Sequence, residues 1–261
     1  MVEKEVEKKW YTDLNKSSLT PPIKKESKGK NFKNNTDLSL KVNVKTAKGR
    51  KLSSTNWLRR QLNDPYVKLA KENGYRSRAA FKLLEINEKF NIFKSGDTVI
   101  DLGCAPGGWT QVAVEKTNSN LDNLKRKKGR VIGIDLKPIL SIQGAEIMEL
   151  DFLDNDFEEK INKILKSKVE NVISDMASNS TGHKKSDHLR IMALCESAAF
   201  FSFNYLNEGG NFVAKVLAGG AEMEIQNILK RKFKKVYNFK PKSSRSDSSE
   251  KYVVALNFKK E

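Results

Sequence analysis

A short apolar segment that ends in a glycine-rich turn, directly before a helical pattern, is the feature that most restricts the fold. Residues 98–102 (Thr-Val-Ile-Asp-Leu) form the apolar segment, residues 103–108 form the turn, and a helix is expected to begin near Trp109. Glycines allow the backbone to adopt conformations that other residues avoid and to approach a ligand closely. The pattern predicts a buried strand followed by a tight turn and a helix, which is the first half of a β–α–β unit.

The same alternation continues along the chain. Four further apolar segments follow, at residues 131–135, 146–151, 172–175 and 211–216, and the segments 233–239 and 252–258 are suited to form a terminal hairpin. Helical patterns separate most of them, at residues 110–115, 157–165, 188–206 and 222–233. Strands that alternate with helices predict an α/β fold with a mostly parallel, seven-stranded sheet and helices on both faces.

Charged residues stand at the carboxyl ends of the five predicted parallel strands. These residues are Asp101, Asp135, Asp151, Asp175 and Lys215. Ligands of open α/β sheets bind outside the carboxyl ends of the strands. We therefore expect these side chains to surround a ligand site at one edge of the sheet.

The glycine-rich turn narrows the choice of ligand. Residues 103–108 match neither the dinucleotide fingerprint G-x-G-x-x-G nor a phosphate-binding loop with its Lys and Ser/Thr. A small adenosine-type cofactor without a phosphate chain fits better, with Asp135 accepting hydrogen bonds from the ribose hydroxyls and Asp151 binding the adenine amino group. A turn that only connects a strand to a helix is the alternative, and the two acids weigh against it.

Composition limits the compartment and the partner. The chain has 261 residues, 49 Lys or Arg against 32 Asp or Glu, and a net charge of +17, which favours a polyanionic partner such as nucleic acid. No apolar run is long enough for a membrane span, and the two cysteines and two histidines suggest neither a disulfide scaffold nor a metal cluster. We expect a cytoplasmic protein without a membrane or metal partner, with a basic, disordered arm at residues 1–40 and one domain at residues 41–261.

The turn reads D-L-G-x-x-P-G-G-W and resembles the first motif of S-adenosylmethionine-dependent methyltransferases. Residues 74–83, the turn 174–177, the strand with Lys215 and residues 243–252 recur in the order seen in the FtsJ (RrmJ-type) ribosomal RNA 2′-O-methyltransferases, and the resemblance covers residues 41–258. It implies a Rossmann-like methyltransferase fold that binds S-adenosylmethionine. The cofactor-binding residues that it implies are Gly107, Trp109, Asp135, Asp151 and Asp175.

The resemblance also implies a catalytic tetrad, which maps onto Lys82, Asp175, Lys215 and Glu250. A ribose 2′-hydroxyl is a poor nucleophile, so the site needs orientation, a proton acceptor and positive charge beside the oxygen. We expect Lys215 to contact the 2′-hydroxyl, either as a base or as an ammonium group that stabilises the oxygen. Asp175 would orient Lys215, and Lys82 and Glu250 would complete the charge balance, with Glu250 the most dispensable. One departure from the family pattern is Ser178, which replaces a proline.

The implied function is methylation of a uridine 2′-oxygen in 23S ribosomal RNA, on the 50S subunit or its late precursor, by a monomeric enzyme. A transfer-RNA or messenger-cap 2′-O-methyltransferase is the nearest alternative, although no paired aromatic residues indicate a cap clamp. A non-catalytic RNA-binding ribosome-assembly factor is a second alternative, against which the intact Asp175 and Lys215 argue. Cys104 and Cys195 are interpreted as packing residues. Arg76, Arg78 and the basic tract 230–235 are candidate phosphate contacts.

Overall fold

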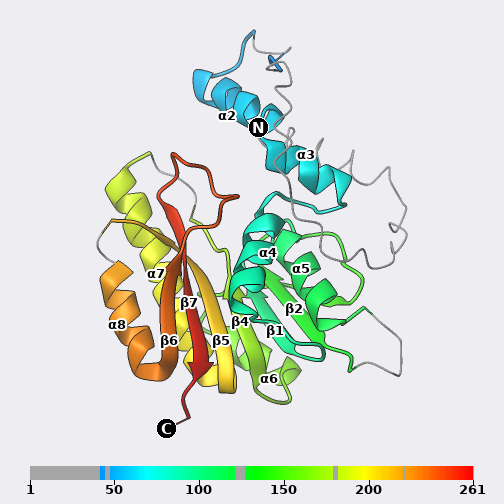
Figure 1. Cartoon of the computed structure of the whole chain (residues 1–261), viewed down its shortest axis with the longest axis vertical. Coiled ribbons are helices and arrows are strands. Elements are labelled where there is room, and N and C mark those ends of the chain that lie inside the picture. Colours follow the sequence, from blue (N-terminus) through cyan, green and yellow to red (C-terminus); the bar gives the residue numbers. More distant parts are fainter. Residues whose placement is uncertain (1–41, 45–47, 121–126, 179–181, 220–221, 261) are drawn as a thin grey trace.

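The computed structural model describes residues 42–44, 48–120, 127–178, 182–219 and 222–260. Its centre is one seven-stranded sheet with the strand order β3-β2-β1-β4-β5-β7-β6 (Figure 1). The strands are β1 (Thr98–Leu102), β2 (Arg130–Asp135), β3 (Ala145–Glu149), β4 (Val169–Ser174), β5 (Leu206–Leu217), β6 (Phe233–Phe239) and β7 (Glu250–Phe258). The predicted basic arm, residues 1–40, lies outside the described residues, and the domain boundary at residue 41 stays a prediction.

Pairing of the strands confirms the predicted mostly parallel sheet. Strands β1 to β5 pair in parallel, whereas β7 lies between β5 and β6 and is antiparallel to both. The hairpin of β6 and β7 is therefore present as predicted. Several strand boundaries shift by one to three residues. The largest shift is in β5, which begins five residues earlier than predicted, and β3 ends before Leu150, which leaves Asp151 in the following loop.

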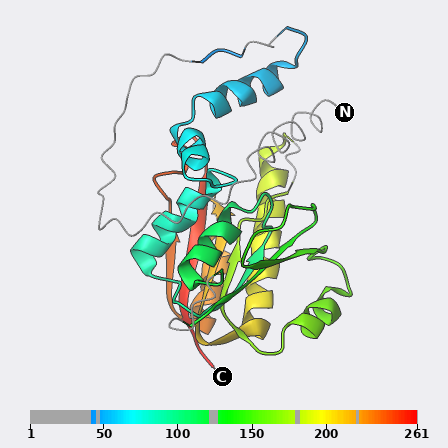
Figure 2. The ribbon, with the colours of Figure 1, turned by 90° about the vertical axis from the view of Figure 1, so that its right-hand side faces the viewer.

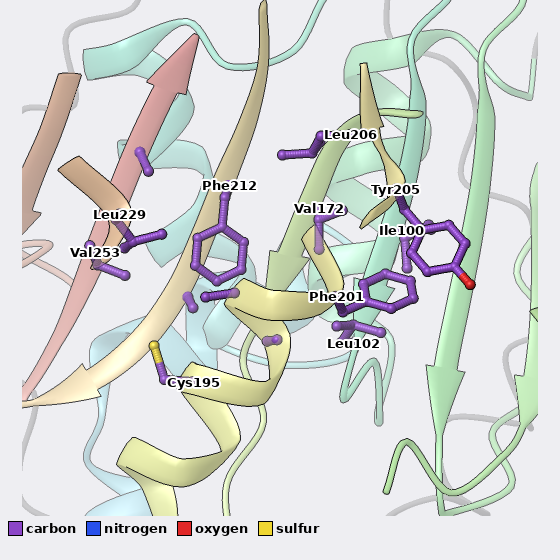
Figure 3. Close-up of a cluster of buried hydrophobic side chains, with 14 of the residues drawn as sticks. Ile100, Leu102, Val172, Cys195, Phe201, Tyr205, Leu206, Phe212, Leu229 and Val253 are labelled. Atoms are coloured by element: carbon purple, nitrogen blue, oxygen red, sulfur yellow. The ribbon is translucent and has the colours of Figure 1, made fainter. Parts of the chain in front are cut away.

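Helices cover both faces of the sheet, as the alternating pattern predicts. The helices of the main body are α4 (Ala79–Phe90), α5 (Gly108–Thr117), α6 (Phe157–Ile164), α7 (Lys184–Tyr205) and α8 (Glu222–Lys232). Successive strand residues point to opposite faces, so Ile100 and Leu102 pack with α6, α7 and α8, whereas Val99 packs with α4 and α5. Figure 3 shows Phe201 on the first of these faces, beside the labelled strand residues.

Burial of these two apolar layers holds the helices on the sheet. Each Val, Leu or Ile side chain that is fully buried contributes about 1.5–3 kcal/mol. Ile100, Leu102, Val99 and Val172 are all fully buried. This burial fixes the positions of the strands, and therefore the points at which the loops after the strands begin.

Two further helices precede the main body and lie beyond one edge of the sheet. They are α2 (Leu52–Leu62) and α3 (Pro65–Glu72), and Figures 1 and 2 show both next to the edge at which the parallel strands end. The Asp64 side chain accepts a hydrogen bond from Tyr66 N and caps α3, with Pro65 in the first helical position. No helix within the described ranges combines the length and apolar character that a bilayer span requires.

Candidate active site

The four residues of the predicted tetrad meet at the carboxyl edge of the sheet. Lys215 lies near the end of β5, and its Nζ donates to the Asp175 backbone oxygen at 2.8 Å and to Asp175 Oδ1 at 3.0 Å. Asp175 directly follows β4, the neighbour of β5 in the sheet. Two adjacent parallel strands therefore deliver this ion pair, which is the pairing that the sequence predicted.

The second ion pair comes from the opposite side of the site. Lys82 Nζ on α4 lies 2.5 Å from Glu250 Oε1 at the start of β7, and their side chains are only 12% and 18% exposed. Removal of two charges from water is costly unless they are paired. The two ion pairs thus bring two lysine and two acidic side chains together in one largely buried cluster.

Tyr252 connects the two ion pairs and was missed by the sequence analysis as a functional residue. Its hydroxyl lies 3.0 Å from Asp175 Oδ1 and 3.1 Å from Glu250 Oε1, and its side chain is fully buried. Burial, and then the charges of Asp175 and Glu250, raise the pKa of Tyr252 well above its usual value, so the hydroxyl keeps its proton and donates it. The available signal is strand register, because Tyr252 pairs directly with Lys215 across β5 and β7.

Charge, rather than exposure to water, keeps Asp175 ionised. Burial alone would raise the pKa of this carboxyl, but the charges of Lys215 and Lys82, together with hydrogen bonds from Lys215 and Tyr252, lower it below the ordinary value. Asp175 is therefore a carboxylate that orients the amine of Lys215.

A network of charged side chains holds the loop that leads into Glu250. Glu85 on α4 accepts hydrogen bonds from the backbone N–H groups of Lys242, at 2.5 Å, and Ser243, at 2.9 Å. Asp64, which is 6% exposed, pairs with both Arg78 and Arg245. The loop between β6 and β7 is thus tied to α4 and to the start of α3.

The structure assigns internal partners to two arginines that the sequence analysis proposed as phosphate contacts. Arg78 donates to Asp64 and to the Ser243 backbone oxygen. Arg76 donates to the backbone oxygens of Leu140 and Ser141 at 2.6 and 2.7 Å. Their guanidinium groups hold loops of the site together. Contact of these arginines with phosphate stays a prediction. Asp64-Pro65 is recognisable from the sequence as a turn or helix start, but the ion pairs of Asp64 with the two arginines were not predicted.

The glycine-rich turn has backbone conformations that leave no room for side chains at two of its positions. Gly103 and Gly107 have φ values of 75° and 110°, and a Cβ atom on Gly107 would come within 2.6 Å of Ile142 Cδ1. Helix α5 begins directly after this turn and has no side-chain cap. Its first backbone N–H groups, including that of Trp109, are therefore available to a ligand with a carboxylate.

The two acids predicted to bind a nucleoside lie at neighbouring strand ends. Asp135 Oδ2 accepts from Ala105 N at 2.8 Å and Oδ1 accepts from Lys137 N at 2.9 Å, which fixes the carboxylate at the end of β2. Asp151 accepts from Leu153 N at 2.9 Å after β3. Each carboxylate keeps further acceptor capacity for a ligand. Leu136 and Leu153 follow these acids and are each 62% exposed, so they provide an apolar rim that the sequence analysis missed.

A buried acid lies beneath the turn. Asp101 is fully buried, its Oδ2 accepts from Thr110 Oγ1 at 2.7 Å, and its Oδ1 has no partner among the described residues. Burial raises the pKa of Asp101 to about 7, with the Thr110 hydrogen bond opposing the rise and the charges of Asp175 and Asp135 adding to it. The Oδ1 atom of Asp101 is therefore a buried polar atom that the described residues leave unsatisfied.

The remaining residues behave mainly as packing elements. The Trp109 indole is 3% exposed, donates from Nε1 to Ala79 O at 2.9 Å and lies 5.4 Å from the Tyr252 ring, so the side chain joins α5 to α4 and β7. Cys104 and Cys195 are buried, as predicted, and burial raises the pKa of both thiols. His188 lies on α7, which begins four residues before the predicted helical pattern at residues 188–206.

Comparison with known proteins agrees with this geometry. The FtsJ-like methyltransferase family matches residues 75–258. The chain belongs to this family. It is 58% identical over 230 residues to a protein of Ruegeria pomeroyi named ribosomal RNA large subunit methyltransferase E, a match that covers 88% of this chain and 99% of the relative. A protein of the same name from Rickettsia bellii is 54% identical and is covered to 95%.

A solved structure extends the similarity to the fold of this FtsJ-like chain. The crystal structure titled as a putative ribosomal RNA methyltransferase from Plasmodium falciparum matches with a TM-score of 0.62 and 32% identity, over 70% of this chain and 98% of that one. The predicted family, the Rossmann-like methyltransferase fold and the assignment as an enzyme are confirmed.

Proposed function

We propose that the chain transfers a methyl group from S-adenosylmethionine to the 2′-oxygen of a uridine ribose in 23S ribosomal RNA, on the 50S subunit or its late precursor. The observation that carries the proposal is the pair of lysine–acid contacts, Lys215 with Asp175 and Lys82 with Glu250, at the carboxyl edge beside the glycine turn. Relatives that match nearly along their full length carry the name ribosomal RNA large subunit methyltransferase E. The net charge of +17 suits an RNA substrate.

The residues at the turn fit the cofactor. Asp135 would hold the ribose hydroxyls and Asp151 the adenine amino group, with Leu136 and Leu153 along the base. Gly107 and the backbone N–H of Trp109 would bind the methionine carboxylate at the start of α5. Asp175 lies between this turn and the lysines and would meet the methionine end. When bound, the cofactor supplies an electrophilic methyl group on a sulfonium sulfur.

Hydrogen bonding to Lys215 leaves one position of its amine for the substrate. Two N–H bonds of Nζ are used by Asp175 O and Oδ1. If the amine is neutral, its lone pair would accept the proton of the 2′-hydroxyl, whose oxygen would bond to the methyl carbon as the methyl–sulfur bond breaks. If it is an ammonium group, its third N–H donates to the developing alkoxide and the proton leaves to water. Lys82 adds positive charge and Tyr252 holds Asp175 in place.

The alternatives that the sequence left open receive less support. Names of the relatives refer to the large ribosomal subunit and not to transfer RNA or a messenger cap. A binding module would gain nothing from the buried pairs. The tetrad is complete within one chain, which supports a monomer as the active species, and a ribosomal substrate supports a cytoplasmic location.

Methyl transfer to ribosomal particles tests the proposal. Wild type, Lys215→Ala and the control Lys166→Ala, which removes an exposed lysine at the opposite edge of the sheet, are incubated with tritiated S-adenosylmethionine and 50S subunits that lack the modification. We expect label on one uridine 2′-oxygen with wild type and control, located by its resistance to nuclease cleavage, and loss of label with Lys215→Ala.

Other outcomes contradict the proposal in different ways. Label on transfer RNA but not on 50S subunits would retain the chemistry and reject the substrate. An absence of label on every RNA, while S-adenosylmethionine still binds, would favour the assembly factor. Equal label with wild type and Lys215→Ala would reject the role of Lys215.

A further inference from the structure

Helix α2 projects from the body at the edge of the sheet that holds the tetrad. Figures 1 and 2 show it beyond α3, and no other described helix or strand packs extensively against it. Packing therefore does not explain why a helix is presented here. Helices of this length are marginal on their own in water, which suggests that a partner covers one face.

One face of α2 is exposed along the whole helix. It is formed by residues at helical spacing, Leu52, Ser53, Asn56, Trp57, Arg59 and Arg60, and we refer to it as the arm face. The opposite side contains the buried Thr55 and the half-buried Leu58. Trp57 is 52% exposed, although tryptophan is a large apolar side chain that is usually well buried.

The segment that contains α2 carries positive charges only. Residues 48–62 contain five Lys or Arg and no acid. In the described part of the chain, neither Arg59 nor Arg60 forms an ion pair. Two unneutralised guanidinium groups next to an exposed indole and two hydrogen-bonding side chains, Ser53 and Asn56, form a surface suited to RNA, because guanidinium groups bind phosphates and aromatic rings stack on bases.

The arm face is held in a defined position relative to the tetrad. The Asn63 side chain exchanges hydrogen bonds with the Val42 backbone at 2.8 and 3.0 Å, which closes the base of the arm. The next residue, Asp64, pairs with Arg78 just before α4 and with Arg245 in the loop before Glu250. Asp64 thus connects the end of helix α2 to the loop that positions Glu250.

Helix α2 lies outside the part of the chain that matches the FtsJ-like family. The FtsJ-like family match begins at residue 75, after α2 and α3. The matches to the large-subunit methyltransferase E proteins cover 88% of the chain, and they must extend through α2, because the chain beyond it is too short to supply that share. Helix α2 therefore lies in the part of the chain that matches proteins named for one substrate, the ribosomal RNA of the large subunit.

We propose that the arm face of α2 docks substrate ribosomal RNA outside the target nucleotide. Arg59 and Arg60 bind phosphates of a flanking RNA segment, and the Trp57 ring stacks on an unpaired base. This inference rests on the proposed function, because it assigns recognition of the same RNA substrate to a second surface. Chemistry stays with the tetrad, and α2 determines which RNA is brought to it.

Two variants of the arm face and one matched control test the proposal. Trp57→Ala and Arg59→Gln/Arg60→Gln change exposed residues only, and the control Lys166→Gln/Lys168→Gln removes two exposed charges at the opposite edge of the sheet. Methyl transfer to unmodified 50S subunits gives kcat and KM, equilibrium dialysis gives the Kd of S-adenosylmethionine, and binding to a 23S ribosomal RNA fragment is measured as a function of KCl concentration.

We expect KM to rise about tenfold in both arm variants, since loss of one stacked base lowers affinity by roughly 5- to 150-fold and loss of two phosphate contacts weakens binding in the same direction. The values of kcat and of the cofactor Kd stay at the wild-type level. The slope of log K against log salt falls in magnitude by about 1.4 for the double arginine variant, because each contact to a single-stranded phosphate contributes about 0.7, and stays unchanged for Trp57→Ala.

Three results would overturn the inference. Unchanged KM in both arm variants would remove the docking role. An equal rise in KM in the control variant would show that the effect comes from overall charge and not from the arm face. Normal binding to the RNA fragment with weakened binding to the 50S subunit would identify a ribosomal protein as the occupant. If wild type methylates no RNA but the arm variants still lose RNA affinity, the proposed function fails and the docking surface stands.

Discussion

The Tyr252 hydroxyl lies 3.0 Å from Asp175 Oδ1, and the same hydroxyl reaches Glu250 Oε1. One buried proton donor thus serves an acid from each ion pair of the site. Because β7 is antiparallel to β5, Tyr252 faces Lys215 in the ladder and shares its strand with Glu250. Removal of this hydroxyl therefore affects both pairs together.

We expect Tyr252→Phe to lower the free energy of unfolding by about 1–3 kcal/mol, because two partly buried carboxylates lose the hydroxyl donor that they share. Methyl transfer should fall about tenfold in kcat with little change in KM, since Asp175 then orients Lys215 less well. Chemical denaturation and steady-state kinetics measure the two effects. Tyr237→Phe, on an exposed β6 tyrosine, is the control, and an equal loss in that variant would contradict the explanation.

Asp101 makes stability depend on pH. Its pKa is about 7 in the folded protein, mainly through burial, and about 3.9 in an unfolded chain. Between these values the folded state binds more protons than the unfolded state, so stability falls as the pH rises from 4 to 7. The asparagine of Asp101→Asn does not titrate. As the pH rises from 4 to 7, the free energy of unfolding of this variant should therefore increase relative to that of wild type by up to roughly 4 kcal/mol. Denaturant midpoints at pH 5 and pH 8 measure the difference, and a constant difference would refute the assignment.

Asp64 neutralises two guanidinium groups that repel each other. Burial and the charge of Arg245 lower the pKa of Arg78, so loss of the carboxylate leaves Arg78 in an unfavourable position. We expect Asp64→Asn to cost about 3 kcal/mol of stability, as for other broken buried pairs, and to reduce methyl transfer through the loop before Glu250. Glu72→Gln removes an exposed acid 3.9 Å from Lys68 and should change stability by less than about 0.5 kcal/mol. Similar melting temperatures for the two variants would show that Asp64 is not an anchor.

Gly107 combines a positive φ with a lack of space. Gly107→Ala places a methyl group against Ile142 Cδ1 and strains the turn, so we expect the Kd of S-adenosylmethionine to rise at least tenfold. Gly209 also has a positive φ, of 80°, but open space around its Cα, and Gly209→Ala should weaken stability alone. Calorimetric titration with the cofactor distinguishes the two, and an unchanged Kd in Gly107→Ala would place the cofactor elsewhere.

Much of the architecture could be predicted because the signals are local. Apolar segments bounded by turns predicted all seven strands, and charged residues at strand ends predicted that Asp135, Asp175 and Lys215 lie at the same edge of the sheet. Tyr252 and Asp64 could not be found in this way, because their partners are distant in the sequence and depend on strand register and loop closure. Arg78 illustrates the limit, since a cation in a motif looks the same whether it faces phosphate or, as here, an internal carboxylate.

The insertion of β7 between β5 and β6 has a consequence for how activity and folding are related. Lys82 comes from α4, before the first strand, whereas Glu250 and Tyr252 come from the one antiparallel strand. No fragment that lacks either end of this span contains the tetrad. Local opening of the β6–β7 hairpin would separate the two ion pairs while the parallel strands remain paired. Enzymatic turnover is therefore a more sensitive indicator of complete tertiary assembly than helix content, because it disappears as soon as that single strand detaches.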